Sequence, residues 1–325
     1  GWGAELHNLV QANEVGVLAQ NGSEVRYNRI YENGTGIQVE SDTWIHHNLI
    51  YRNSGDGVLV EGARNVDIVN NTIYAPGGDG VRVRDFSEQV LIRDNIIYTQ
   101  SGHGLYIEAD SQFGYASDYN NLYATGGGRV AFQGKSFDDV YDWQVEAEMD
   151  LHSIGRTDPH PARDDPRFVS LDEDDFHLMS ESTSIDAGHP GSDYSREPDP
   201  NGGRVNLGAY GNTPEAATSP ASWLRITAPN FYVDLVPSRS YQIRWETYQV
   251  PGSDTLDIDL VEVGPETHWD VATVQVSAGS VTWSPGDFVS GDTNKRYRIA
   301  LSTSGATSLT AASREAFSIP AIVPA

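Results

Sequence analysis

Short runs of alternating apolar and polar residues return along the first 125 residues of the chain. One run begins at an Asn, as in Asn28-Arg29-Ile30-Tyr31, and it returns at Asn48, Asn71 and Asn95. A weaker first copy begins at Asn8 and a degenerate last copy at Asn120. The spacing between these Asn residues lies in the low twenties, and self-similarity at such a period is typical of a stacked solenoid.

Each repeat carries a second landmark eight or nine residues after its Asn, as in Gly36-Ile37-Gln38-Val39 and Gly57-Val58-Leu59-Val60. Period-two alternation with β-branched residues predicts short strands with one buried face. A leucine-rich repeat would need a Leu ladder and a helical turn in every repeat. The pattern therefore predicts a right-handed parallel β-helix with about three strands per coil.

Stacking at the inter-strand spacing of about 4.8 Å places equivalent residues of successive coils in columns. If inward and outward side chains alternate along each strand in this way, Ile73 points inward and Thr72 points to solvent. We expect the recurring Asn residues to stack at a bend that they enter in the left-handed region, and the Gly of each second landmark to supply a positive φ. The expected buried columns are Ile30, Ile50, Ile73 and Ile97, and Val25, Ile45, Ile68 and Ile92.

The repeat decays after Tyr123, and the sequence then becomes acidic and loop-rich. An open solenoid end needs a cap for solubility. We therefore expect residues 1–211 to form a β-helix whose part from about 124 to 211 is a loop-rich cap over the hydrophobic end. Residues 212–222 contain two Pro residues and are predicted to be a linker.

The remaining residues, 223–325, show a different pattern. Tyr241, Ile243 and Trp245 alternate with polar residues, and similar short runs are separated by Gly, Pro, Ser and Asp. This pattern predicts an antiparallel β-sandwich with the Trp side chains in its core. The whole chain is therefore predicted to be all-β.

Three segments carry a family resemblance. Ser117–Tyr123, Asp165–Val169 and Leu207–Tyr210 resemble the final coils of secreted pectate-lyase-like β-helix proteins of bacteria. Residues 223–325 are similar to the fibronectin-III-like, Ser/Thr-rich modules of microbial surface proteins. The resemblance implies an extracellular or cell-surface location in a bacterium, and it implies no single activity because many functions share this fold.

The composition limits the classes of molecule that this protein can bind. The net charge of −25 excludes the basic footprint of a nucleic-acid-binding protein and disfavours anionic lipid. No apolar run reaches the length of a membrane span, so we expect no membrane insertion. Because the chain opens at coil level with Gly1-Trp2-Gly3, we expect it to be the C-terminal part of a larger protein, assembled with preceding domains or with other copies.

Outward positions of the second strand of each coil form a candidate ligand face. A uronate polymer offers carboxylates, which Arg can bind with two parallel hydrogen bonds, and rings, which Tyr can stack against. Neighbouring Glu61 and Glu108 leave open the alternative of a surface ion ladder. The candidate carbohydrate-binding residues are Arg82, Arg84, His103, Tyr106 and Glu108.

Asp56 and Asp79 occupy matching places in two Gly-Asp-Gly turns. Stacked carboxylates repel each other unless a cation lies between them, and Ca²⁺ readily accepts carboxylate oxygens. Calcium is therefore the candidate cofactor, with these two residues as the candidate metal ligands. The alternative is that Asp is simply a favourable turn residue before Gly.

The sequence favours a non-catalytic role first, as a structural stalk or polysaccharide-binding surface, because every recurring residue has a structural explanation. The alternative is a carbohydrate-active enzyme, a lyase or epimerase on uronate polymers. Such an enzyme needs a group that neutralises the carboxylate and a base, for which His46, His103 and Tyr106 are candidates. No residue stands out as catalytic from the sequence alone.

Overall fold

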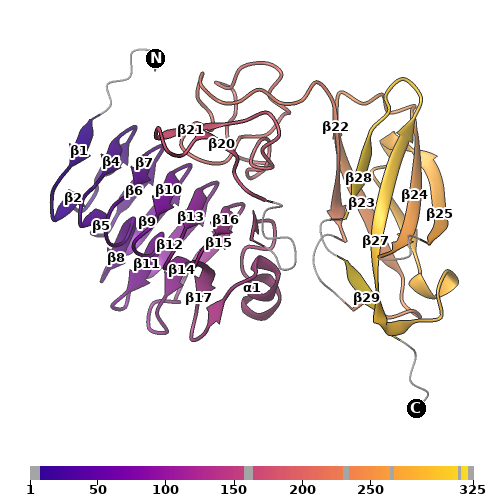
Figure 1. The fold of residues 1–325 in the computed structure, drawn as a ribbon, viewed down its shortest axis with the longest axis horizontal. Coiled ribbons are helices and arrows are strands. Elements are labelled where there is room, and N and C mark those ends of the chain that lie inside the picture. The colour runs from indigo at the N-terminus through magenta and orange to yellow at the C-terminus, as the bar shows by residue number, and fades with distance from the viewer. Residues whose placement is uncertain (1–7, 157–163, 230–233, 264–266, 314–315, 321–325) are drawn as a thin grey trace. The chain divides into compact units, whose positions relative to one another are not determined.

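The computed structural model describes residues 8–156, 164–229, 234–263, 267–313 and 316–320. The chain divides into two compact units, residues 1–219 and 220–325. Both units are built mainly of β-strands (Figure 1).

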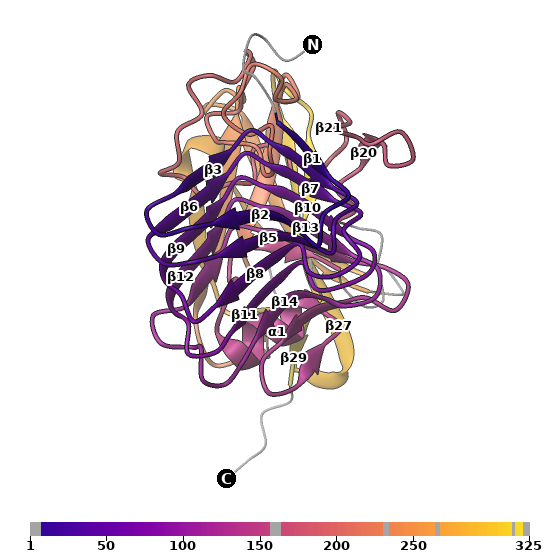
Figure 2. The same ribbon diagram turned by 90° about the vertical axis from the view of Figure 1, so that its left-hand side faces the viewer.

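The first unit is a solenoid in which the chain visits three parallel sheets in turn and then begins the next coil (Figure 2). Sheet A contains β1 (Leu9–Gln11), β4 (Arg29–Tyr31), β7 (Leu49–Tyr51), β10 (Thr72–Ala75), β13 (Ile96–Thr99), β16 (Asn121–Ala124) and β19 (Ile154–Gly155). Sheet B contains β2 (Val15–Ala19), β5 (Thr35–Val39), β8 (Val58–Glu61), β11 (Val81–Arg84), β14 (His103–Ile107), β17 (Arg129–Phe132) and β18 (Ser136–Phe137). Sheet C contains β3 (Glu24–Arg26), β6 (Thr43–His46), β9 (Arg64–Val69), β12 (Glu88–Arg93) and β15 (Ala116–Asp118).

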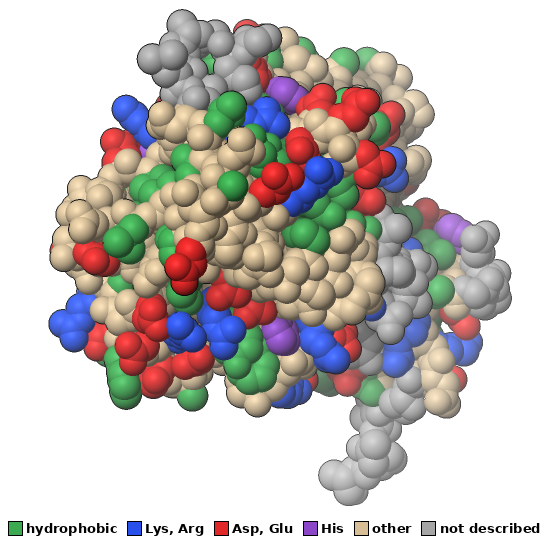
Figure 3. All heavy atoms as spheres, turned by 60° about the vertical axis from the view of Figure 1, so that its left-hand side comes forward, with side chains coloured by type: hydrophobic (Ala, Val, Ile, Leu, Met, Phe, Trp, Pro, Cys, Tyr) green, Lys and Arg blue, Asp and Glu red, His purple; other side chains and the backbone are tan. Residues whose placement is uncertain are grey.

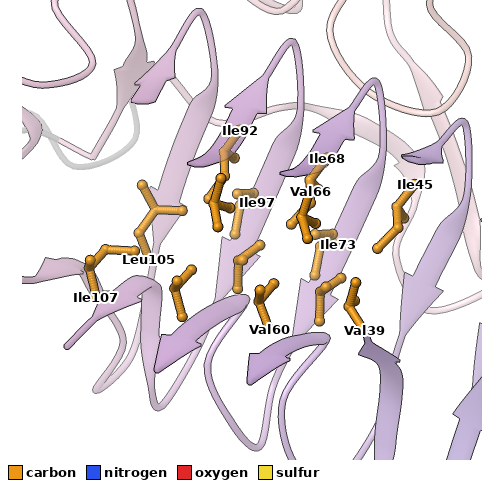
Figure 4. Close-up of a cluster of buried hydrophobic side chains, with 14 of the residues drawn as sticks. Val39, Ile45, Val60, Val66, Ile68, Ile73, Ile92, Ile97, Leu105 and Ile107 are labelled. Atoms are coloured by element: carbon orange, nitrogen blue, oxygen red, sulfur yellow. The ribbon is translucent and has the colours of Figure 1, made fainter. Parts of the chain in front are cut away.

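The expected buried columns are confirmed. Ile50 pairs with Ile73, and Ile73 with Ile97, in the register of sheet A, and these side chains are fully buried. Figure 4 shows the Ile and Val side chains of successive coils converging in the interior. Burying one such side chain stabilises the fold by about 1.5–3 kcal/mol, so each column contributes substantially to the stability of the coils.

A ladder of Asn side chains runs along the corner between sheets C and A. The Nδ2 atom of each Asn donates to the Oδ1 atom of the Asn one coil later, at 2.9–3.1 Å. From Asn28 to Asn120, the left-handed residue is the one before the Asn, such as His47 (φ 55°) and Asp94 (φ 59°), and not the Asn itself as expected from the sequence. The ladder satisfies buried amides that otherwise cost about 1–3 kcal/mol each. Its members are Asn8, Asn28, Asn48, Asn71, Asn95 and Asn120.

The recurring Gly residues also differ from expectation. Gly57 and its equivalents in neighbouring coils do not have a positive φ in the described part of the chain. A Cβ atom on Gly57 would lie 2.6 Å from the carbonyl oxygen of Gly80 and 2.6 Å from Cγ2 of Ile73. Gly is therefore required because the backbone of one coil approaches the next coil closely.

Residues 129–155 close the C-terminal end of the solenoid. The antiparallel hairpin β17–β18 is followed by helix α1 (Val140–Ala147), which lies at the end of the stack of coils (Figure 1). Trp143 is fully buried and belongs to the same apolar core as Leu122 and Val130. This part of the predicted cap therefore covers the hydrophobic end, as expected.

Residues 164–219 have a different role from the expected one, because they cover the outer face of sheet A. The hairpin of β20 (Phe168–Ser170) and β21 (Asp175–Leu178) places Phe176 against Tyr51 and Tyr74, with ring centroids 5.0 and 6.4 Å apart. Thr72, predicted to face solvent, is only 2% exposed under this segment. That prediction was wrong because the cover packs on the side of the solenoid and not on its end.

The predicted linker begins later than residue 212. Residues up to Ser219 belong to the first unit. The backbone N–H of Ser219 donates to the carbonyl oxygen of Pro200 at 2.7 Å, and Nδ2 of Asn206 donates to the carbonyl oxygen of Ala217 at 2.8 Å. These bonds hold the start of the segment on the solenoid.

The second unit consists of antiparallel sheets, consistent with the predicted sandwich. One sheet contains β22 (Trp223–Ala228), β23 (Tyr241–Tyr248) and β26 (Ser280–Trp283). The other contains β24 (Thr255–Glu262), β25 (His268–Gln275), β27 (Asp292–Ser304), β28 (Thr310–Ala312) and β29 (Phe317–Ile319), and the 3₁₀ turns are Val276–Ala278 and Pro285–Asp287. Trp245 and Trp283 are buried in the core, and Nε1 of Trp245 donates to the carbonyl oxygen of Val276 at 2.9 Å.

Candidate functional site

The candidate ligand face lies on the outside of sheet B, where the strand register brings the predicted column together. Arg82 pairs with Tyr106, and Tyr106 with Phe132, in successive strands. The guanidinium carbon of Arg82 lies 4.3 Å from the ring centroid of Tyr106. The Tyr106 and Phe132 rings stack with centroids 4.4 Å apart and planes inclined by 9°. We call Arg82, Arg84, Tyr106, Glu108 and Phe132 the sheet B strip.

The charged members of the strip form ion pairs, one of them with Glu61 beside the strip. Arg84 lies 2.8 Å from Glu61, and Arg82 lies 3.7 Å from Glu108. Figure 3 shows such mixing of acidic and basic side chains on the solenoid surface. The Nε atoms of both Arg residues are buried and have no hydrogen-bond partner in the described residues. The ion pairs are each worth about 0–1 kcal/mol, so a ligand carboxylate can compete with them.

Beside the strip, Asp79, His103 and Ser136 form a chain of hydrogen bonds. Oδ1 of Asp79 lies 3.2 Å from Nδ1 of His103, and Nε2 of His103 lies 2.9 Å from Oγ of Ser136. Oδ1 of Asp79 also accepts the backbone N–H of His103 at 2.7 Å. An ionised Asp79 fixes the proton of His103 on Nδ1, because a carboxylate can only accept. Nε2 is then the acceptor for the Ser136 hydroxyl.

Asp56 and Asp79 are brought into neighbouring turns, as expected, but each serves the backbone of the next coil. Oδ1 of Asp56 accepts the backbone N–H of Asp79 at 3.1 Å. Burial raises the pKa of Asp56 above its usual value, and the nearby charge of Asp79 raises it further. Oδ2 of Asp79 lies 3.5 Å from Arg82. Among the residues that the structure describes, no three His, Cys, Asp or Glu side chains are grouped as a metal site requires.

His46, the other candidate base, is not brought to this face. It lies on sheet C, where its Nε2 atom is 2.9 Å from Glu24 and its ring stacks on Trp44 with centroids 3.9 Å apart. Its Nδ1 atom is 2.7 Å from Nδ1 of His47. Burial, together with the nearby charge of His46, lowers the pKa of His47 to about 3, so His47 is neutral at pH 7.

A separate cleft of about 420 Å³ lies between Tyr98 of sheet A and the segment that covers this sheet. Leu171 and Met179 give it an apolar wall, and Asp165 and Arg167 give it polar groups. Its volume falls within the usual range for small-molecule sites. None of the candidate binding, metal or catalytic residues predicted from the sequence lines this cleft.

The sequence did not point to two residues on the face of sheet B, Phe132 and Ser136. Both lie beyond Tyr123, where the repeat no longer gives a register. Ser136 enters the site through the hairpin β17–β18, in which it pairs with Phe132. A regular column could have suggested Phe132 as the next aromatic after Tyr106, whereas nothing in the sequence indicated Ser136.

Comparison with known proteins supports the architecture. Residues 5–139 match the family model described as the right-handed β-helix region. No curated protein and no solved structure matches the chain. In the described residues, no helix has the length and apolar character needed to cross a membrane. The first unit is therefore a right-handed parallel β-helix, a fold compatible with a structural or carbohydrate-related role.

Proposed function

We propose that this right-handed β-helix is the C-terminal part of a larger secreted or cell-surface bacterial protein, in which it serves as a support and binds an acidic polysaccharide along the sheet B strip. The observation that carries the proposal is the continuous stack of the Arg82 guanidinium, the Tyr106 ring and the Phe132 ring. A guanidinium group and aromatic rings in one row offer charge and apolar surface to a chain of acidic sugars.

The physical argument rests on charge and shape. The first unit is strongly acidic, so an anionic chain is repelled by most of its surface and attracted only where Arg side chains gather. The Arg82–Glu108 pair is long, at 3.7 Å, and a uronate carboxylate can replace Glu108 with a bidentate pair. Tyr106 and Phe132 are partly exposed, and the edges of the two stacked rings offer an apolar surface to a sugar.

The test compares two double variants of equal charge change. We expect R82A/R84A to lose binding to polygalacturonate, whereas R26A/R64A, which removes two exposed Arg residues from sheet C, should bind as the intact chain does. Binding to the neutral polymer galactan should be weak in all three proteins. Equal polygalacturonate binding by both double variants would exclude the sheet B strip as the site.

A second candidate function is a lyase or epimerase acting on uronate polymers. The structure brings a carboxylate-neutralising group, Arg82, to the same face as two candidate bases, and the rings of His103 and Tyr106 have centroids 5.4 Å apart. A lyase would release unsaturated uronate ends, which are detected by their ultraviolet absorbance. Absence of such product, and of a change in the epimer ratio, would leave binding as the function.

We further propose that residues 220–325 act as a fibronectin-III-like surface module of the same protein. The support is the antiparallel arrangement of β22–β29 around an apolar core that includes the buried Trp side chains. Attachment of this unit to intact bacterial cells, tested separately from residues 1–219, would decide whether it anchors the protein.

A further inference from the structure

We propose that Asp79, His103 and Ser136 form a hydrolytic triad that cleaves acyl esters. Its substrate would be an ester-bearing sugar held on the sheet B strip. The choice of an acidic glycan as the substrate rests on the proposed function, whereas the ester chemistry rests on the three residues alone.

The proposal rests on which atoms of the three residues are joined by hydrogen bonds, and in which order. A serine nucleophile needs a His whose Nε2 atom can take the hydroxyl proton, and a carboxylate that holds the opposite nitrogen protonated. Both links are present, at 2.9 Å from His103 to Ser136 and at 3.2 Å from Asp79 to His103. The reverse tautomer would leave Nδ1 of His103 without a proton beside the Asp79 carboxylate.

Each member is held by a different part of the fold. Asp79 lies in the turn before β11 and is buried, and the Arg82 guanidinium 3.5 Å from its Oδ2 atom balances its charge. His103 begins β14, and the bond from its backbone N–H to Asp79 fixes its distance from the carboxylate. Ser136 begins β18 and is partly exposed. The Asp79 carboxylate is held by a hydrogen bond and an ion pair, and the Ser136 hydroxyl is on a partly exposed residue that a substrate can reach.

The aromatic stack places a substrate next to Ser136. Phe132 is the strand partner of Ser136, and the ring of His103 lies 5.5 Å from Phe132 and 5.4 Å from Tyr106. A sugar ring that lies on Phe132 therefore has its substituents beside the Ser136 hydroxyl.

The reaction balances with water as the only co-reactant. The Ser136 oxygen attacks the ester carbonyl carbon while its proton moves to Nε2 of His103. The C–O bond to the sugar breaks, and the sugar oxygen takes that proton from His103, which leaves Ser136 acylated. Water then attacks the acyl carbon and gives a proton to His103. The proton returns to the Ser136 oxygen as the free carboxylic acid leaves.

Another Asp–His pair of the solenoid, Asp118 and His152, serves as a control. Asp118 accepts the backbone N–H of His152 at 2.8 Å and lies 2.7 Å from its Nδ1 atom, as Asp79 does for His103. The His152 side chain is exposed on another part of the solenoid. Replacing His152 therefore removes a similar Asp–His bond without touching the proposed triad.

The test uses p-nitrophenyl acetate as substrate and a fluorophosphonate as covalent probe, both with the full chain. We expect turnover, and mass spectrometry should find the phosphonyl group on Ser136. S136A and H103Q should each lower kcat/KM by at least about a hundredfold. H152Q should leave kcat/KM unchanged, and all variants should keep the melting temperature of the intact chain within a few degrees.

The outcomes separate this inference from the proposed function. Ester hydrolysis that requires Ser136, in a chain that does not bind polygalacturonate, would support the triad and reject the glycan as its substrate. Polygalacturonate binding without turnover or labelling would reject the triad and keep the binding function. Labelling at a different serine, or full turnover by S136A, would also overturn the inference.

Discussion

The side-chain oxygen of Thr72 accepts a hydrogen bond of 3.0 Å from the backbone N–H of Ala209, 137 residues later in the chain. Gly208, beside it, approaches so closely that a Cβ atom there would lie 2.7 Å from Oγ1 of Thr72. The covering segment is therefore fitted to the outer face of sheet A at the level of single atoms. Both faces of β10 are buried, although only one was expected to be.

Substitution of Thr72 tests this cover. We expect T72D to lower the free energy of unfolding by several kcal/mol, because it buries a carboxylate where a hydroxyl accepts a backbone N–H. T72S keeps the oxygen and should cost about 1 kcal/mol or less. Chemical denaturation measures both. A T72D variant as stable as T72S would show that the cover opens readily.

A substitution in the middle of an Asn ladder should destabilise the fold more than one at the exposed end of a ladder. N48A removes an acceptor that serves both the backbone N–H and Nδ2 of Asn28, as well as the donor to Asn71. We expect a loss of about 2–4 kcal/mol in the free energy of unfolding, because buried partners remain unsatisfied. N13A, at the exposed end of the shorter ladder Asn13–Asn33–Asn53, should cost well under half as much. Similar melting temperatures for the two variants would contradict a structural role for the ladder.

Glu197 should make stability fall as the pH rises. Burial raises its pKa to about 7 from the ordinary 4.5, although its Oε1 atom accepts two backbone N–H groups, and the charge of Asp186 adds to the effect. Between these pKa values the folded chain holds a proton that the unfolded chain has lost, so the free energy of unfolding decreases with pH there. The decrease attributable to this group is about 3 kcal/mol by pH 8.

The matched variant for this pH effect is E197Q, which keeps an oxygen for the two N–H groups and does not titrate. Its unfolding free energy, measured from pH 4 to pH 8, should lack the contribution of Glu197. The difference between the two proteins should therefore grow in favour of E197Q as the pH rises. A constant difference across the range would show that Glu197 titrates normally in the folded chain.

Calcium should not stabilise the turns of Asp56 and Asp79, because Oδ1 of each residue already accepts a backbone N–H group and Oδ2 of Asp79 pairs with Arg82. We therefore predict the same melting temperature in millimolar calcium and in a chelator. A bound cation would instead raise the melting temperature with its concentration. If it did so in the intact chain and not in D56N, a calcium site would be established.

Limited proteolysis should cleave after Ser219 and before β22. The bonds of Ala217 and Ser219 hold the preceding residues on the first unit, so cleavage within residues 212–218 is not expected. Two fragments, each resistant to further digestion, are the expected products, and mass spectrometry locates the cut. Rapid loss of either fragment would show that this unit does not fold alone.

The solenoid could be predicted because its repeats align identical side chains. Ile30, Ile50 and Ile73 give the inward phase directly, and the columns of Arg82 and Tyr106 follow from the same register. The cover of sheet A could not be predicted, because it depends on contacts such as Thr72–Ala209 between segments without periodicity. A polar Thr in an outward position is compatible with either solvent or a hydrogen-bonded interface.

The candidate site was predictable to the same extent. Arg82, Arg84, Tyr106 and Glu108 followed from strand alternation, and the structure brings them to one face. Ser136 was not predictable, because the hairpin that carries it reverses direction after the last regular coil. Its meeting with His103 depends on side-chain geometry that no repeat encodes.

The Asn ladder also has a direction, and Asp150 is where it stops. The amide-to-amide bonds of the ladder all point toward the C-terminal end, and the last Asn, Asn120, donates to Oδ1 of Asp150 at 3.1 Å. Asp150 also accepts from Ser153 and Trp143. The Asp150 carboxylate accepts hydrogen bonds at the place where a further Asn would both accept and donate, so the row of amide-to-amide bonds ends at this residue. One buried acid therefore marks the C-terminal end of the Asn ladder.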